Sequence, residues 1–217
     1  MEYKGISESE FHFVIPEVKT PLKELTELYN KVKDYSYTWN DYKKKYDPNK
    51  HHQPRGDGGL GAVYSPDLEG IEIKDYPVVK EFLRNFIFYQ PDEKDINNES
   101  GLEGNDVTFM TYEPGFVFKK HTDREMQYNL MMPILPLTNN EPIHYWVGED
   151  KDRDITDKKV ATVYYNFDHP TVCNGKALHS VDEIKEHRVI FRIKLAKESF
   201  ESIRERYKRG TFLNVND

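Results

Sequence analysis

The feature that most constrains the fold is a succession of β-rich runs between Val107 and Leu195. The runs are VTFMTY (107–112), FVFKKH (116–121), MQYNLMMPI (126–134), IHYWV (143–147), VATVYYNF (160–167) and RVIFRIKL (188–195). Segments rich in Asn, Pro, Asp and Gly separate them, as turns separate strands. Strands that follow one another without intervening helices predict an antiparallel sandwich or jelly roll rather than a doubly wound parallel sheet.

Helical patterns occur only outside this β-rich stretch. Apolar residues at helical spacing predict a helix over 21–34, behind Thr20-Pro21, and another over 76–89, with Asp75 as its N-cap. A terminal helix is expected over 197–209, before Gly210, and Phe11–Ile15 reads as a short strand. The fold class predicted is therefore α+β, mainly β, in one domain over 1–217.

In this prediction, a helical N-terminal region of about 1–106 supports a jelly-roll core, or double-stranded β-helix, of about 107–195. The N-terminal helices are expected to pack on the major sheet, because each carries a wide apolar stripe.

Composition restricts the cellular setting and the class of partner. The net charge of −7 gives no general reason to expect a polyanionic partner. The one cysteine, Cys173, forms no intramolecular disulfide, which fits a reducing compartment. The start of the chain lacks the basic and apolar regions of a signal peptide, and no apolar run could span a bilayer. We expect a cytoplasmic protein without a membrane partner, in the host cytoplasm if a virus encodes it.

Residues 35–61 interleave tyrosines and a tryptophan with lysines and an arginine, before a glycine-rich turn. Three interpretations stay open: a surface that binds phosphates or stacks on bases, a solvated loop, and a mobile lid over an active site. The acidic chain as a whole favours the solvated loop.

Two histidines and an aspartate form the candidate site. His121 and Asp123 are two positions apart, so on a strand both side chains point to the same face. His179 follows 56 residues after Asp123, which leaves room for intervening hairpins to return the chain beside the first strand. Two imidazoles and one carboxylate can hold one face of a ferrous ion and leave the opposite face open.

Arg188 lies nine positions after His179, at the start of RVIFRIKL. Alternation puts Val189, Phe191, Ile193 and Leu195 on one face of that strand, to pack under the helices. Arg188, Ile190 and Arg192 take the face that lines the barrel. An inward arginine is costly unless it is paired, so an anionic partner is expected at Arg188, whereas Arg192 is expected in a salt bridge at the strand end.

The order His-x-Asp, His and then Arg on a predicted double-stranded β-helix resembles the Fe(II)- and 2-oxoglutarate-dependent dioxygenases. HSVDEIKEHRVIFRI, after NFDHPTVCNGKAL, is most similar to the prolyl-hydroxylase-like and aspartyl/asparaginyl-hydroxylase-like branches, and also to small oxygenases encoded by phages. The resemblance covers about 107–195. Asp123 departs from the aspartyl/asparaginyl hydroxylases, which lack a metal-binding carboxylate.

The resemblance implies that His121, Asp123 and His179 bind Fe(II) and form the catalytic centre, with O₂ and 2-oxoglutarate as co-substrates. Arg188 would pair with the distal carboxylate of 2-oxoglutarate. Ile190 stands where many relatives carry a hydroxyl group, so Tyr112, Gln127 and Asn129 are candidates to complete the carboxylate site.

The implied reaction hydroxylates an unidentified substrate and releases succinate and CO₂. A protein side chain or a small molecule is favoured as substrate over a nucleic acid. The alternatives are a cupin-type metalloenzyme that does not use 2-oxoglutarate, and a non-catalytic jelly-roll module for binding or structure. A nucleic-acid demethylase of the same superfamily is favoured only by residues 35–55, and salt-dependent nucleic-acid binding would be its sign.

Overall fold

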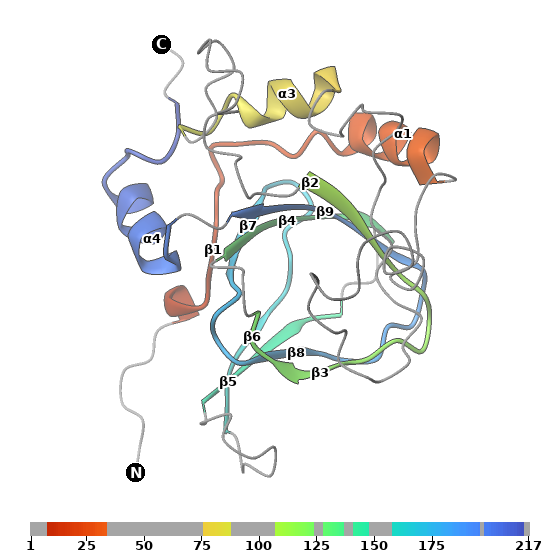
Figure 1. Cartoon of the computed structure of the whole chain (residues 1–217), viewed down its shortest axis with the longest axis vertical. Helices are drawn as coiled ribbons and strands as arrows, with labels where there is room; N and C mark the ends of the chain where they lie inside the picture. The colour runs from red at the N-terminus through yellow and green to blue at the C-terminus, as the bar shows by residue number, and fades with distance from the viewer. Residues whose placement is uncertain are drawn as a thin grey trace, which may run out of the picture.

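The computed structural model of the protein describes residues 8–33, 76–87, 107–123, 128–136, 141–147, 158–195 and 198–214. The predictions for segment 35–61, for Asp75 and for Gln127 lie outside these residues. In the described part, two antiparallel sheets and a few helices make a mainly β fold (Figure 1).

The larger sheet has five strands in the order β1-β7-β4-β9-β2. Their bounds are β1 His12–Val14, β7 Thr171–Asn174, β4 Tyr128–Leu135, β9 Arg188–Leu195 and β2 Val107–Tyr112. The smaller sheet has four strands in the order β3-β8-β5-β6. Their bounds are β3 Phe118–His121, β8 His179–Val181, β5 Ile143–Val147 and β6 Lys158–Val163. The sheets face each other in Figure 1.

Strand β9 contributes alternate side chains to the two apolar clusters that lie on opposite faces of the larger sheet. Val189, Phe191 and Ile193 belong to the cluster on the helix side of the larger sheet. Ile190 belongs to the cluster between the sheets, where it joins side chains such as Tyr145 of β5. The predicted alternation is thus confirmed for these residues, and it directs Arg188 toward the space between the sheets.

Helices α1 (Leu22–Val32) and α3 (Pro77–Leu83) cover the outer face of the larger sheet (Figure 1). Leu25, Leu28, Tyr29 and Val32 are the buried side chains of α1, and the ring of Tyr29 lies 5.5 Å from that of Phe109 in β2. The packing of the N-terminal helices on the larger sheet is therefore as predicted.

Helix α3 is shorter than the helix predicted over 76–89. Its N-cap residue is Tyr76 rather than Asp75, and Pro77 is its first residue. The helix ends at Leu83 because the following residues pair elsewhere: Phe86 forms a β-bridge with Leu213, and the Asn85 side chain donates to the Phe82 carbonyl at 2.8 Å. The tertiary contact with the C-terminal segment overrides the helical pattern.

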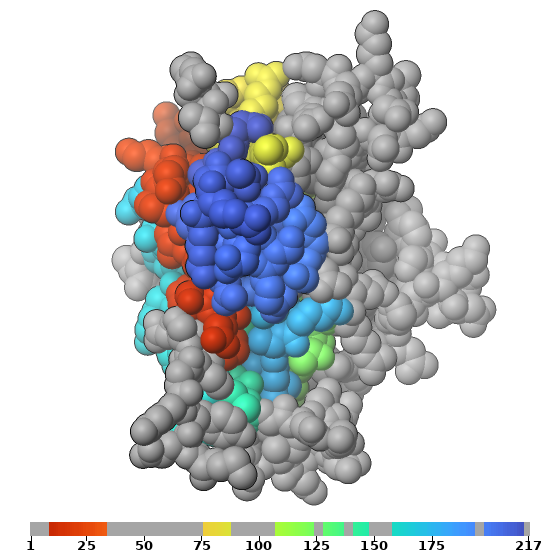
Figure 2. All heavy atoms as spheres, turned by 90° about the vertical axis from the view of Figure 1, so that its left-hand side faces the viewer, coloured from red at the N-terminus to blue at the C-terminus, as the bar shows by residue number. Residues whose placement is uncertain are grey.

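Helix α4 (Phe200–Lys208) begins three residues later than predicted, because Ser199 is its N-cap and accepts the Ser202 N–H at 3.2 Å. It ends before Gly210, whose φ of +69° suits a residue without a Cβ. Figure 2 shows α4, in dark blue, directly above the N-terminal segment, where Arg204 donates to the Ser9 carbonyl at 3.2 Å. Among the described residues, no helix is long and apolar enough to cross a membrane.

Two strands of the structure are absent from the sequence-based prediction. β7 and β8 lie in NFDHPTVCNGKALHSV, which is short of long apolar runs and rich in turn-forming residues. Both are short central strands, and pairing on both sides holds them in place. They turn out to carry or support most of the candidate site.

Candidate metal centre

His121 and His179 are direct partners across the pairing of β3 and β8. Residues opposite each other in an antiparallel pair project from the same face of the sheet. The two imidazole centroids are 4.3 Å apart. On the other side of β8, His179 pairs with Tyr145, whose ring belongs to the cluster between the sheets. The smaller sheet therefore presents both imidazoles on its inner face.

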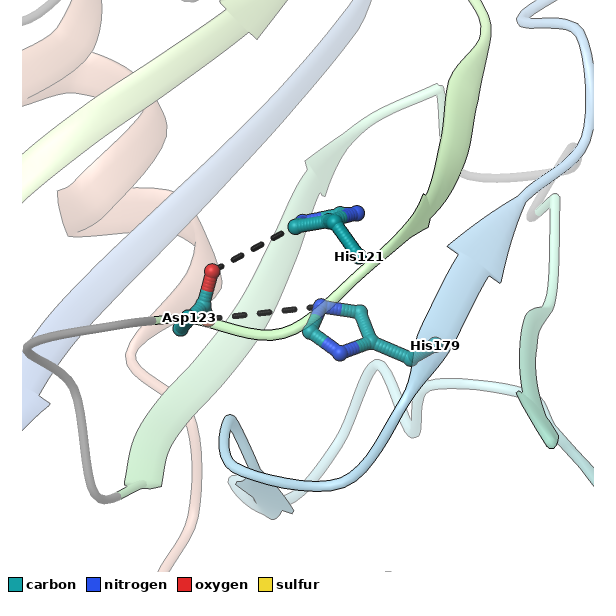
Figure 3. A group of neighbouring side chains, drawn as sticks. All are labelled: His121, Asp123 and His179. Atoms are coloured by element: carbon teal, nitrogen blue, oxygen red, sulfur yellow. Dashed lines mark ion pairs between the residues drawn. The ribbon is translucent and has the colours of Figure 1, made fainter. Parts of the chain in front are cut away.

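Asp123 joins the two histidines by a route that differs from the prediction. β3 ends at His121, so strand alternation does not orient Asp123. Instead, the Asp123 N–H donates to the Gly175 carbonyl at 2.7 Å, which fixes the chain just beyond the strand. The carboxylate reaches the histidines all the same (Figure 3): Oδ1 lies 3.6 Å from His121 Nε2, and Oδ2 lies 4.0 Å from His179 Nε2.

The three side chains offer one ligand atom each, and these atoms all lie within 4.8 Å of one another. Their side chains are 20%, 14% and 13% exposed for His121, Asp123 and His179. The group is thus largely enclosed by protein but not sealed from solvent.

Backbone carbonyls determine which imidazole nitrogen carries the proton. Nδ1 of His121 lies 2.7 Å from the Lys119 carbonyl oxygen, and Nδ1 of His179 lies 2.8 Å from the Ala177 carbonyl oxygen. A carbonyl oxygen only accepts, so each Nδ1 donates its proton, and each neutral ring keeps a lone pair on Nε2. Both Nε2 atoms point toward Asp123 (Figure 3).

In this neutral form, the two Nε2 lone pairs and the Asp123 carboxylate converge with no proton between them. They repel one another unless a cation lies among them. Metal-bound histidines in proteins generally donate their other ring N–H to a carbonyl or carboxylate, as both histidines do here. The donor set therefore fits a divalent transition metal that accepts imidazole and carboxylate ligands.

Asn174, which the sequence reasoning missed, organises the turn that supports these ligands. Its Oδ1 accepts the N–H groups of Lys176 at 3.0 Å and Ala177 at 3.3 Å, and its Nδ2 donates to the Glu10 carbonyl at 3.3 Å. The turn orients the Gly175 carbonyl that holds Asp123 and the Ala177 carbonyl that holds His179. The signal in the sequence is the Asn-Gly pair five residues before His179.

Arg188 is buried, with 3% of its surface exposed, and its guanidinium carbon lies 5.1 Å from the centre of the Tyr165 ring. The expected anionic partner exists and is Glu141, which the sequence reasoning did not single out. Arg188 Nη1 lies 3.8 Å from Glu141 Oε2. Arg192 is also buried, at 4% exposure, further along β9.

Tyr165 connects the arginine electrostatically with the histidine-aspartate cluster. Burial raises the pKa of its hydroxyl far above the usual value of a tyrosine, the positive Arg188 counteracts this rise, and the negative Asp123 adds to it. The Tyr165 hydroxyl, between the sheets, thus interacts electrostatically with both Arg188 and Asp123. Contacts link the two as well: Tyr165 lies against Arg188, and Tyr145, of the same apolar cluster, has its ring 5.9 Å from that of His179.

The remaining candidates differ in what surrounds them. Tyr112 is buried against Phe116 and Phe118, and its hydroxyl donates to Met110 Sδ at 3.4 Å. Asn129 is buried in β4, and its Oδ1 has no hydrogen-bond partner within the described part of the chain. An acceptor left in this state is available to a ligand or water.

No protein-family model matches the sequence, and neither does any curated protein. Among solved structures, the chain is similar to a prolyl-4-hydroxylase from Pseudomonas putida. The sequence identity is 10%, the TM-score is 0.42, and the alignment covers 87% of this chain and 93% of that chain. A likeness this distant does not assign the chain to a family.

Proposed function

We propose that this protein is an Fe(II)- and 2-oxoglutarate-dependent oxygenase that hydroxylates a protein side chain or a small molecule, with release of succinate and CO₂. In this proposal the two sheets are those of a double-stranded β-helix. The observation that carries it is the convergence of His121 Nε2, His179 Nε2 and the Asp123 carboxylate, together with a buried arginine, Arg188, on β9 of the other sheet. The carboxylate ligand favours the prolyl-hydroxylase-like branch.

His121, Asp123 and His179 would hold the iron. When bound, Fe(II) supplies O₂ activation, coupled to oxidative decarboxylation of 2-oxoglutarate. The contribution of the chain is to accept hydrogen bonds from both Nδ1–H groups at backbone carbonyl oxygens, so that both Nε2 atoms are directed to the metal. The backbone bond from Asp123 to Gly175 keeps the carboxylate within reach of both rings.

Arg188 would bind the distal carboxylate of 2-oxoglutarate. It suits this role because it is buried and remains charged at any physiological pH, and because a guanidinium binds a carboxylate through two parallel hydrogen bonds. The aromatic side chains around it, Tyr165 and Tyr112, exclude water and so strengthen the attraction. Asn129, Tyr112 and Gln127 are proposed to contribute further polar contacts.

The decisive experiment adds Fe(II) and then 2-oxoglutarate to the protein under anaerobic conditions and records the visible spectrum. We expect a metal-to-ligand charge-transfer band in the wild type, no band in His179→Ala, and a weaker band in Arg188→Ala. His144→Ala is the matched control, since His144 is a buried histidine outside the cluster that bonds Thr162 and Asp182. Its band should equal that of the wild type.

A folded, iron-loaded wild type that gives no band would contradict the proposal. It would favour a cupin-type metalloenzyme that does not use 2-oxoglutarate. One observation supports that second candidate: Glu141 already balances the charge of Arg188, so the arginine does not require an external anion. Iron binding that depends on His179 but does not respond to 2-oxoglutarate would identify this case.

A further inference from the structure

Arg188 and Glu141 form a buried ion pair without a hydrogen bond between them. Their closest atoms, Nη1 and Oε2, are 3.8 Å apart, which exceeds the usual range of about 2.7–3.2 Å for an N–H···O bond. Within the described residues, Arg188 Nη2 and Glu141 Oε2 also have no hydrogen-bond partner. A guanidinium has five N–H donors, so this buried arginine keeps donors free for a further acceptor.

Glu141 is held in place independently of Arg188. Its Oε1 accepts the backbone N–H of Lys185 at 3.0 Å, in the loop between β8 and β9. Because this bond does not involve the arginine, Glu141 can stay where it is when a second anion arrives. The residue is only 8% exposed, so solvent and salt screen its charge poorly.

We propose that Glu141 sets the affinity of the Arg188 site: it is a fixed internal carboxylate that shares the guanidinium with the distal carboxylate of 2-oxoglutarate and keeps that co-substrate weakly bound. This inference rests on the proposed function. Without ligand, the pair of charges is balanced. With ligand, two carboxylates surround one guanidinium, and one buried negative charge is left uncompensated.

Replacement of Glu141 by glutamine tests the idea with little change in shape. The amide oxygen of Glu141→Gln can still accept the Lys185 N–H, while its NH₂ group can donate to the ligand carboxylate. Glu183→Gln is the matched control. Glu183 lies in the loop between β8 and β9 that also contains Lys185, and it carries the same charge as Glu141, but its side chain is 52% exposed and pairs with Lys185 Nζ at 3.1 Å.

The measurement is isothermal titration of 2-oxoglutarate into the full-length protein loaded with Mn(II), which binds to imidazole and carboxylate ligands. We expect Glu141→Gln to bind 2-oxoglutarate about tenfold more tightly than the wild type, because a poorly screened like charge has been removed. Glu183→Gln should stay within about twofold of the wild type, because an exposed charge is screened. Arg188→Met should bind 2-oxoglutarate much more weakly than the wild type, in line with the weaker band expected for Arg188→Ala.

Glu141→Leu is the second variant, for the case in which Glu141→Gln does not fold, since it also removes the charge. Near-ultraviolet circular dichroism establishes the fold of each variant before titration. If the wild type binds and the folded charge-removing variant binds equally or more weakly, the inference is wrong and the proposed function stands. If neither the wild type nor any variant binds 2-oxoglutarate, the proposed function fails and this inference with it.

Discussion

Asn174 touches no ligand atom of the candidate metal centre, yet it should control the affinity for metal. Its amide fixes the turn whose carbonyl groups hold Asp123 and His179. In Asn174→Ala, three hydrogen bonds are lost, at about 0.5–1.5 kcal/mol each, so the free energy of unfolding should fall by about 2–4 kcal/mol. Loss of groups that orient metal ligands typically lowers metal affinity by about 10–100-fold, and we expect the same here.

The chain provides a matched control in Asn166. Its Oδ1 accepts the N–H groups of Asp168 at 2.8 Å and His169 at 2.9 Å, in a comparable turn that supports no ligand of the cluster. Asn166→Ala should therefore destabilise the protein by about 1–3 kcal/mol and leave metal affinity unchanged. Asn174→Asp keeps both acceptor bonds and loses only the donor to the Glu10 carbonyl, so its affinity should lie near that of the wild type.

Urea unfolding gives the stability of each variant, and titration with Co(II), followed by its visible absorption, gives the affinity. The Co(II) titrations are done at urea concentrations well below the unfolding midpoint of every variant, where all variants are folded. The reasoning fails if Asn174→Ala lowers Co(II) affinity no more than Asn166→Ala does, because the turn would then be an ordinary structural feature.

Three further predictions concern the core and the ends of elements. Burial raises the pKa of the Cys173 thiol to about 12 from a reference value of 9.0, so it should not react with a disulfide reagent at pH 8 until urea unfolds the chain. The same shift means that its contribution to stability is complete below pH 9 and is lost as the pH rises toward 12; replacement by Ala should flatten this decline in urea midpoints. Phe191→Ala empties a fully buried site beside the Phe109 ring, 5.1 Å away, and should cost about 3–5 kcal/mol in urea unfolding; a cost below 1 kcal/mol would contradict the packing described. Ser199→Ala should cost about 1 kcal/mol by loss of the cap of α4, whereas Ser199→Asp should retain it.

The sequence predicted the elements in which one pattern dominates. β2, β5 and β9 coincide with their predicted runs, because β-branched, aromatic and other apolar residues make up most of each run and no Gly, Asn or Asp interrupts it. Helix α1 also lies within its predicted range, since its apolar stripe and its Pro21 start agree. Where local preference and tertiary packing point the same way, the pattern is sufficient.

The rest depended on contacts between distant residues. β7 and β8 are strands because neighbours on both sides pair with them, although they are only four and three residues long and lie among turn-forming residues. α3 stops early because Phe86 pairs with Leu213. These partners are far away in sequence, so no local pattern reveals them.

The candidate site likewise has residues that the sequence could predict and supporting groups that it could not. His121, Asp123 and His179 could be chosen from the spacing and the order of residue types, and the structure brings them together. The groups that act on them, Asn174 and the backbone carbonyls, could not be chosen, since hydrogen bonds across a turn depend on the folded backbone. Glu141 was missed for a similar reason, because it lies 47 positions before Arg188 in the sequence and meets it only in the folded chain.

The pairing of β1 with β7 determines when this centre can be assembled during synthesis. Glu10 and Phe11 are made well before Asn174, 164 positions after Glu10, yet their carbonyl groups accept hydrogen bonds from it. The growing chain therefore has to keep β1 unpaired until β7 has been made. Contacts over such long separations form slowly. Metal loading should accordingly follow the synthesis of β7, and a change that hinders the pairing of β1 should delay it without altering a single ligand.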